Sequence, residues 1–161
     1  MRRELEQFLD ELLLEASDSS TGTAKYLDAD GKECEVTIAD LILNGADPDV
    51  YYVKDELTPI MLCALNQNLE GYKILADISS FEIQSVDGST ILHHAIKGGN
   101  DEIIEDIISI APGILDAKNI RNQTPIMCAI KYGRDNALEM LLRTCPKSFL
   151  VPYFALFLLI F

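Results

Sequence analysis

The stretch "GSTILHHAIKGGND", residues 88–101, places two adjacent histidines inside an apolar run. Two further stretches share its pattern, "LTPIMLCALNQN" at 57–68 and "QTPIMCAIKYGRDN" at 123–136, and neither contains a histidine. A pattern that recurs with its histidines replaced indicates a structural repeat rather than a catalytic or metal site.

The copies align on their threonines, at spacings of 32 and 34 residues: Thr58, Thr90 and Thr124. Each threonine is placed to cap a short helix, and a proline follows it in two copies. A break comes nine residues later, at Gln67, Gly99 and Gly133, before a second helix with apolar residues every three or four positions. This pattern predicts helix pairs at 59–66 with 68–78, 91–98 with 101–110, and 125–132 with 135–144.

Small residues lie in the first helix of each copy, among them Ala64, Ala95 and Ala129. They would let neighbouring helices approach closely. One helix pair cannot bury its apolar face alone, but stacked pairs can, and a period near 33 residues is typical of such an array.

The segments before the repeats are less regular. Residues 3–16 have the apolar spacing of an amphipathic helix, and 17–23 form a polar break. Residues 24–36 fit either a hairpin that turns at Asp30 and Gly31 or a degenerate helical turn. Residues 37–49, "TIADLILNGADPD", predict a short helix capped by Thr37. The expected organisation is an N-terminal helix and linker at 1–23, a repeat array at 24–148 and an apolar tail at 149–161.

The repeats resemble the ankyrin repeat over about residues 37–148. The matches are "TPIMLCA", "TILHHA" and "TPIMCA", the two turn glycines, and "LILNGADPD", which would close an earlier repeat whose first helix is not recognisable. The resemblance implies an all-α solenoid of helix-turn-helix units, with about three clear repeats and a degenerate N-terminal one. Met61 and Met127 replace the family's histidine, and Gln67 replaces a turn glycine.

The resemblance also gives the histidine pair a role. His93 occupies the family's histidine position, which implies a clasp that bonds the backbone of a connecting loop, and His94 stands where a leucine usually packs. A zinc site needs three or four ligands, which two histidines do not supply.

Other candidate sites fail on spacing. A calcium loop that starts at Asp28 would need glycine at its sixth position and glutamate at its twelfth, but Gly31 falls at the fourth. The glycines of "KGGND", 97–101, lack a Gly-Lys-Ser/Thr pattern. Cys63 and Cys128 lie on first helices, where burial rather than nucleophilic chemistry is expected. We therefore expect no catalytic residue, no cofactor and no metal.

The chain of 161 residues has a formal net charge of -13. Such acidity disfavours nucleic acid and anionic membrane surfaces as partners. Acidic residues interrupt the N-terminal helix, so it does not resemble a secretory signal peptide. Four cysteines without a close pair fit a reducing, cytoplasmic location.

The segment "FLVPYFALFLLIF", 149–161, holds thirteen residues without a charge. A spanning helix needs about 20. We expect this tail to pack on the last repeat; a cut from a longer array and a tail that touches a membrane remain alternatives.

The repeat and the lack of a catalytic pattern predict a non-enzymatic protein–protein interaction module, with no small-molecule substrate. The alternative is a membrane-associated protein anchored by its apolar tail. The resemblance implies binding through loop tips and the concave face of the first helices. The residues at those positions are Lys54, Asp55, Leu57, Leu65, Asn66, Val86, Asp87, Ser89, Lys97, Gly98, Ile120, Arg121, Gln123, Lys131 and Tyr132. Arg121 and Tyr132 stand out because Arg and Tyr are enriched in binding hot spots.

Overall fold

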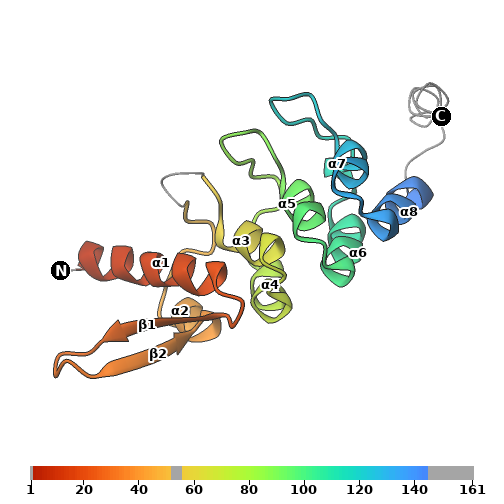
Figure 1. Cartoon of the computed structure of the whole chain (residues 1–161). Helices are drawn as coiled ribbons and strands as arrows, with labels where there is room; N and C mark the ends of the chain where they lie inside the picture. Colours follow the sequence, from red (N-terminus) through yellow and green to blue (C-terminus); the bar gives the residue numbers. More distant parts are fainter. Residues whose placement is uncertain (1, 52–55, 145–161) are drawn as a thin grey trace.

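The protein is an array of stacked helix pairs with one inserted hairpin (Figure 1). A computed structural model describes residues 2–51 and 56–144. The elements are α1 (Arg2–Asp18), β1 (Thr23–Leu27), β2 (Glu33–Thr37), α2 (Ile38–Leu43), α3 (Pro59–Leu65), α4 (Leu69–Ala76), α5 (Ile91–Gly98), α6 (Asp101–Ile110), the 3-10 turn η1 (Pro112–Ile114), α7 (Pro125–Tyr132) and α8 (Asp135–Thr144). The tail at 149–161 lies outside the described residues.

The helices form two rows. The first helices pack in the order α1, α3, α5, α7, and the second helices in the order α2, α4, α6, α8. One continuous apolar core runs between the rows, from Leu13 of α1 to Leu141 of α8. The three predicted helix pairs are confirmed, with small shifts at the ends of α3 and α4.

The expectation of an all-α chain is wrong at residues 23–37, where the structure has an antiparallel hairpin. Ala24 is buried and Tyr26 half-buried, while Lys25 and Leu27 point to solvent, which is the alternation of a strand with one covered face. The turn between the strands is stabilised by Asp28, whose carboxylate accepts hydrogen bonds from the backbone N–H groups of Asp30 and Lys32. Of the two alternatives for this segment, the hairpin that turns at Asp30 and Gly31 is confirmed.

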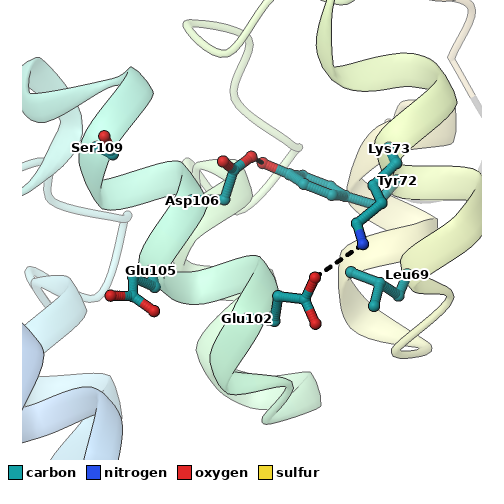
Figure 2. A pocket seen from close by; sticks show the side chains of 7 residues that line it. All are labelled: Leu69, Tyr72, Lys73, Glu102, Glu105, Asp106 and Ser109. Carbon is teal, nitrogen blue, oxygen red and sulfur yellow. Dashed lines mark hydrogen bonds and ion pairs between the residues drawn. The ribbon is translucent and has the colours of Figure 1, made fainter.

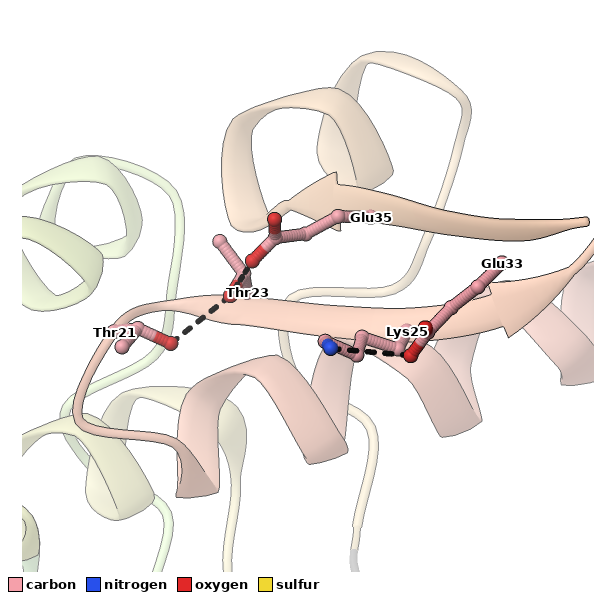
Figure 3. Close-up of polar contacts among 5 residues, drawn as sticks. All are labelled: Thr21, Thr23, Lys25, Glu33 and Glu35. Carbon is pink, nitrogen blue, oxygen red and sulfur yellow. Dashed lines mark hydrogen bonds and ion pairs between the residues drawn. The ribbon is translucent and has the colours of Figure 1, made fainter.

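The exposed face of the hairpin carries its own cross-strand contacts (Figure 3). Lys25 and Glu33 form an ion pair at 3.1 Å, and the Thr23 hydroxyl donates to Glu35 at 2.7 Å. On the other side, the ring of Tyr26 meets Phe8 of α1 edge-on, with centroids 6.2 Å apart. These contacts fix the strand register and attach the hairpin to α1.

Helix α1 occupies the first position of the first-helix row, although no repeat motif marks it. Its Leu13 and Ala16 are fully buried, and α1 packs against α3 as α3 packs against α5. Asn66 donates to the carbonyl of Asp18 and Asn68 to that of Ser19, so the α3–α4 turn binds the C-terminal end of α1.

The same type of contact joins the later repeats. Arg134 donates to the carbonyls of Lys97 and Gly98 at the end of α5, at 3.0 Å each. At the α3–α5 junction the backbone itself is close, because a Cβ added to Gly98 would lie 2.5 Å from the carbonyl oxygen of Ala64. The C-terminal carbonyls of α1 and α5, groups that a helix leaves without intrahelical partners, are therefore bound by the following repeat, and those of α3 lie against Gly98.

The small-residue register needs one correction. Counted from the threonines, Cys63 rather than Ala64 is equivalent to Ala95 and Ala129. All four side chains are nevertheless buried in the core that the stacked helices share.

The threonines lie at the helix starts as predicted, but their hydroxyls differ in role. Thr37 accepts from the N–H of Asp40. The hydroxyl of Thr124 accepts a long bond, 3.5 Å, from the N–H of Met127. Thr58 is buried and makes no side-chain cap bond. What these helix starts share is the position of the threonine and its extended backbone conformation, not the same hydrogen bond from the hydroxyl group.

The turn after each first helix requires a left-handed residue. Gly99 and Gly133 supply it with φ of 93° and 63°, but Gln67 adopts φ of 61° with a side chain. This conformation costs an ordinary residue about 1–2 kcal/mol. We predict that Gln67→Gly raises the free energy of unfolding by about 0.5–1 kcal/mol, the relief being partly offset by glycine's greater unfolded-state entropy. Urea unfolding followed by circular dichroism measures it.

The matched variant is Gly133→Ala, where no atom lies within 4 Å of the added Cβ. It should lower the free energy of unfolding by about 1 kcal/mol through backbone strain alone. A Gln67→Gly protein no more stable than the parent would show that the left-handed turn is not strained.

Candidate partner-binding surface

The candidate surface comprises the loops before the first helices and the exposed ends of those helices. Two of its residues, Lys54 and Asp55, lie outside the described residues. Figure 1 shows the loops before α5 and α7 extending in parallel from the body of the array. Their tips are therefore presented side by side, apart from the second-helix row.

Each of these loops is built as a short hairpin-like turn. In the first, the N–H of Ser85 donates to the carbonyl of Ser89 at 3.0 Å. In the second, the N–H of Asn119 donates to the carbonyl of Gln123 at 3.1 Å. The N–H of Ile120 then donates to the carbonyl of Asp87 at 2.9 Å, which joins the two tips directly.

His93 makes the loop clasp that the resemblance implies. Its Nδ1 accepts from the N–H of Thr90 at 3.2 Å, so the proton is on Nε2, which donates to the carbonyl of Gln123 at 3.0 Å. Burial lowers the pKa of His93, which favours this neutral form. Met61 and Met127 have no ring nitrogen with which to form the same clasp.

His94 belongs to a polar cluster that the sequence did not reveal. The Ser85 hydroxyl lies 2.9 Å from Asp87 Oδ1 and 3.1 Å from His94 Nε2. The serine thus lies between the carboxylate and the imidazole, whereas a catalytic triad places the imidazole in the middle to remove the serine proton. Ser85 is also buried. The cluster orders the loop tip, and the signal that could have revealed it is the Ser-Val-Asp-Gly-Ser turn sequence, 85–89.

Electrostatics in this cluster favour a charged aspartate and a neutral histidine. Burial by itself would raise the pKa of Asp87, but hydrogen bonds from Ser89 and Ser85 outweigh it and lower the pKa. Burial lowers the pKa of His94 to about 4; the nearby Asp87 charge opposes this shift, while His93 and Lys97 add to it.

Several predicted binding residues are occupied within the array. Asn66 binds α1, Asp87 and Ser89 bond within their own loop, and the carbonyl of Gln123 accepts from His93. Leu57 and Leu65 are half-buried. Gly98, also at a predicted position, is buried against α3. The residues at these positions therefore stabilise the loops and helices beneath the surface, and their side chains are less available to a partner.

The remaining predicted residues are all exposed, and together we call them the strip. Val86 and Ile120 lie at the joined loop tips with 58% and 75% of their area exposed, and Arg121 follows beside them. Lys131 and Tyr132 lie in the last turn of α7, where the Lys131 ammonium lies 5.2 Å from the centroid of the Tyr132 ring. Lys97 lies at the same position of α5 as Lys131 of α7. Because α7 rises about 1.5 Å per residue, the strip extends along the helix and is not a single cluster.

A hollow lies between α4 and α6 on the second-helix row (Figure 2). It measures about 340 Å³ and is lined by Leu69, Tyr72, Lys73, Glu102, Glu105, Asp106 and Ser109. The Tyr72 hydroxyl donates to Asp106 at 2.7 Å, and Lys73 pairs with Glu102 at 2.8 Å. These two contacts pair most of the polar groups of the hollow with one another. They link α4 to α6 and so join two neighbouring repeats.

Metal and thiol chemistry gain no support from residues 2–51 and 56–144. No group of three His, Cys, Asp or Glu side chains there could hold a metal ion. Cys63 and Cys128 are buried, as expected, and burial raises the pKa of the Cys63 thiol to about 12, which keeps it protonated at neutral pH. Within the same part of the chain, no helix combines the length and apolar character needed to cross a bilayer.

Comparison with known protein families yields a match. The family model described as "Ankyrin repeats (3 copies)" matches residues 29–114 and 82–149, which together cover most of the chain. No curated protein matches the chain in sequence.

The His94 environment predicts an acid-sensitive contribution to stability. The folded-state pKa of about 4 lies below the ordinary value of 6.5, so between these pH values the unfolded chain binds a proton that the folded chain does not. The stabilising contribution of neutral His94 is thus fully present above pH 6.5 and is lost as the pH falls toward 4. We predict that, between pH 6.5 and pH 4, the free energy of unfolding falls by about 2–3 kcal/mol more in the parent than in His94→Gln.

Urea unfolding of both proteins at a series of pH values measures the difference. His93 and the 26 acidic residues are present in both proteins, so the comparison isolates the effect of the side chain at position 94. Parallel stability profiles for the two proteins would contradict burial of a neutral His94.

Proposed function

The chain belongs to the ankyrin-repeat family, whose members are generally protein–protein interaction modules, and from this premise we propose that it is a non-enzymatic module that binds a protein partner through the exposed strip of its loop tips and first helices. The strip consists of Val86, Lys97, Ile120, Arg121, Lys131 and Tyr132. The proposal takes the array as about three clear repeats and a degenerate first repeat made of α1, the hairpin and α2.

The observation that carries the proposal is the apolar pair at the loop tips. Val86 and Ile120 remain exposed although the backbone beneath them is joined by the Ile120 to Asp87 hydrogen bond. Large apolar side chains held on an ordered backbone lose little freedom when a partner covers them. They therefore suit the buried centre of an interface.

The charge of the strip favours an acidic or amphipathic segment as its partner. Lys97, Arg121 and Lys131 are all exposed, in a chain of net charge -13. Among the described residues none of the three forms an ion pair, in contrast to Lys25 and Lys73. Their charges remain available to steer and align an acidic partner.

Aromatic character strengthens the α7 end of the strip. Tyr132 combines a large apolar ring with a hydroxyl, and the adjacent Lys131 holds a cation over that ring. Tyr and Arg are enriched where interfaces concentrate their binding energy. Arg121, in the loop before α7, and Tyr132, the last residue of α7, are therefore the two strongest candidates for partner contacts.

The test is a double variant, Arg121→Glu with Tyr132→Ala. We predict that it weakens binding of partners recovered by the parent at least tenfold, since truncation of one hot-spot residue alone commonly costs about 1–2 kcal/mol or more. Binding is measured by calorimetry with each partner, after unchanged thermal unfolding of the variant has been verified.

The matched control is Lys32→Glu with Leu27→Ala on the hairpin. It makes the same charge reversal and also removes an exposed apolar side chain, but far from α7. Full affinity in the Arg121 and Tyr132 variant, or equal losses in both variants, would contradict binding through the strip.

A further inference from the structure

The last helix pair has an open apolar face at positions that the preceding pair, α5 and α6, buries. Ile130 of α7 is 56% exposed, whereas Ile96, at the same position of α5, is fully buried. Leu142 of α8 is 39% exposed, whereas the equivalent Ile108 of α6 is 8% exposed. We call Ile130, Leu138 and Leu142 the end face.

The cause of the difference is stacking. α5 packs against α7 and α6 against α8, so the next pair covers Ile96, Ile104 and Ile108. Leu138, equivalent to the fully buried Ile104, is only half-buried. Within the described residues no helix stacks on α7 and α8 from the far side. The end face therefore has the apolar residues of an interface between repeats, but no described helix pair covers it.

We propose that residues 149–161 of the same chain cover the end face and close the array. This segment of thirteen residues carries no charge, and only four residues separate it from Thr144, the last residue of α8. Four residues reach at most about 14 Å, roughly the length of α8 itself, so the segment starts within reach of the end face. The inference does not depend on the proposed partner or its binding strip.

Tethering favours this occupant over a second copy of the chain. A short linker gives an effective concentration in the millimolar range, well above ordinary protein concentrations. Both candidate surfaces are apolar and gain by leaving water. A bilayer is the weaker competitor because thirteen residues fall short of the roughly 20 that a spanning helix needs.

The absence of tryptophan from the chain provides a direct test. In the full chain, Phe157→Trp places one fluorescent reporter in the tail. We expect blue-shifted emission and protection from acrylamide, relative to the same protein in urea, at all protein concentrations and without lipid. Adding Ile130→Glu should shift the emission to the red and increase quenching.

The matched control adds Ile74→Glu instead, on α4, where the side chain is 39% exposed and far from the end face. It should leave the emission unchanged. Because Ile130 and Ile74 are both exposed, neither change should unfold the chain, and circular dichroism verifies this.

Four results would overturn the proposal. They are a solvent-exposed tryptophan in the otherwise unchanged chain, burial that appears only as protein concentration rises, burial that appears only with phosphatidylcholine vesicles, and an emission insensitive to Ile130→Glu. The second result would identify a second copy as the occupant, and the third a membrane.

Discussion

Close stacking of the first helices is the contact on which the rest of the structure depends. Small residues such as Ala95 and Gly98 bring the helices together, and the turn of one repeat binds or abuts the carbonyl end of the preceding first helix. Asn68 and Arg134 do so by hydrogen bonds. Because this stacking sets the spacing of the loops, it also joins their tips and exposes Val86 and Ile120 on one surface.

The helix pairs from α3 to α8 could be predicted because their signals are local. Threonine and proline mark the starts, and glycine in the left-handed conformation marks the ends at Gly99 and Gly133. The place of α1 could not be predicted. Its sequence shows an amphipathic helix, but only tertiary packing shows that it stacks on α3. The hairpin remained one of two alternatives because its alternation is short and its register depends on contacts with α1.

The candidate site was predictable in outline and not in detail. Register from the threonines located the exposed tips, and Ile120, Arg121, Lys131 and Tyr132 are exposed as a binding role requires. The same register could not separate them from residues whose polar groups are used internally. Asp87 and Gln123 look like surface residues in sequence, but their roles depend on hydrogen bonds with Ser85 and His93 that only the folded loops form.

The central claim is that α1 belongs to the same core as the motif-bearing repeats, and Leu13→Ala tests it most directly. Leu13 is fully buried in that core. If α1 is the first layer of one stacked array, this change should lower the free energy of unfolding by about 2–5 kcal/mol. Urea unfolding followed by circular dichroism should then show one transition at a lower midpoint with an unchanged slope. A main transition that stays at the parent midpoint, preceded by a separate small loss of helix, would show that α1 folds apart from the array and would contradict the account.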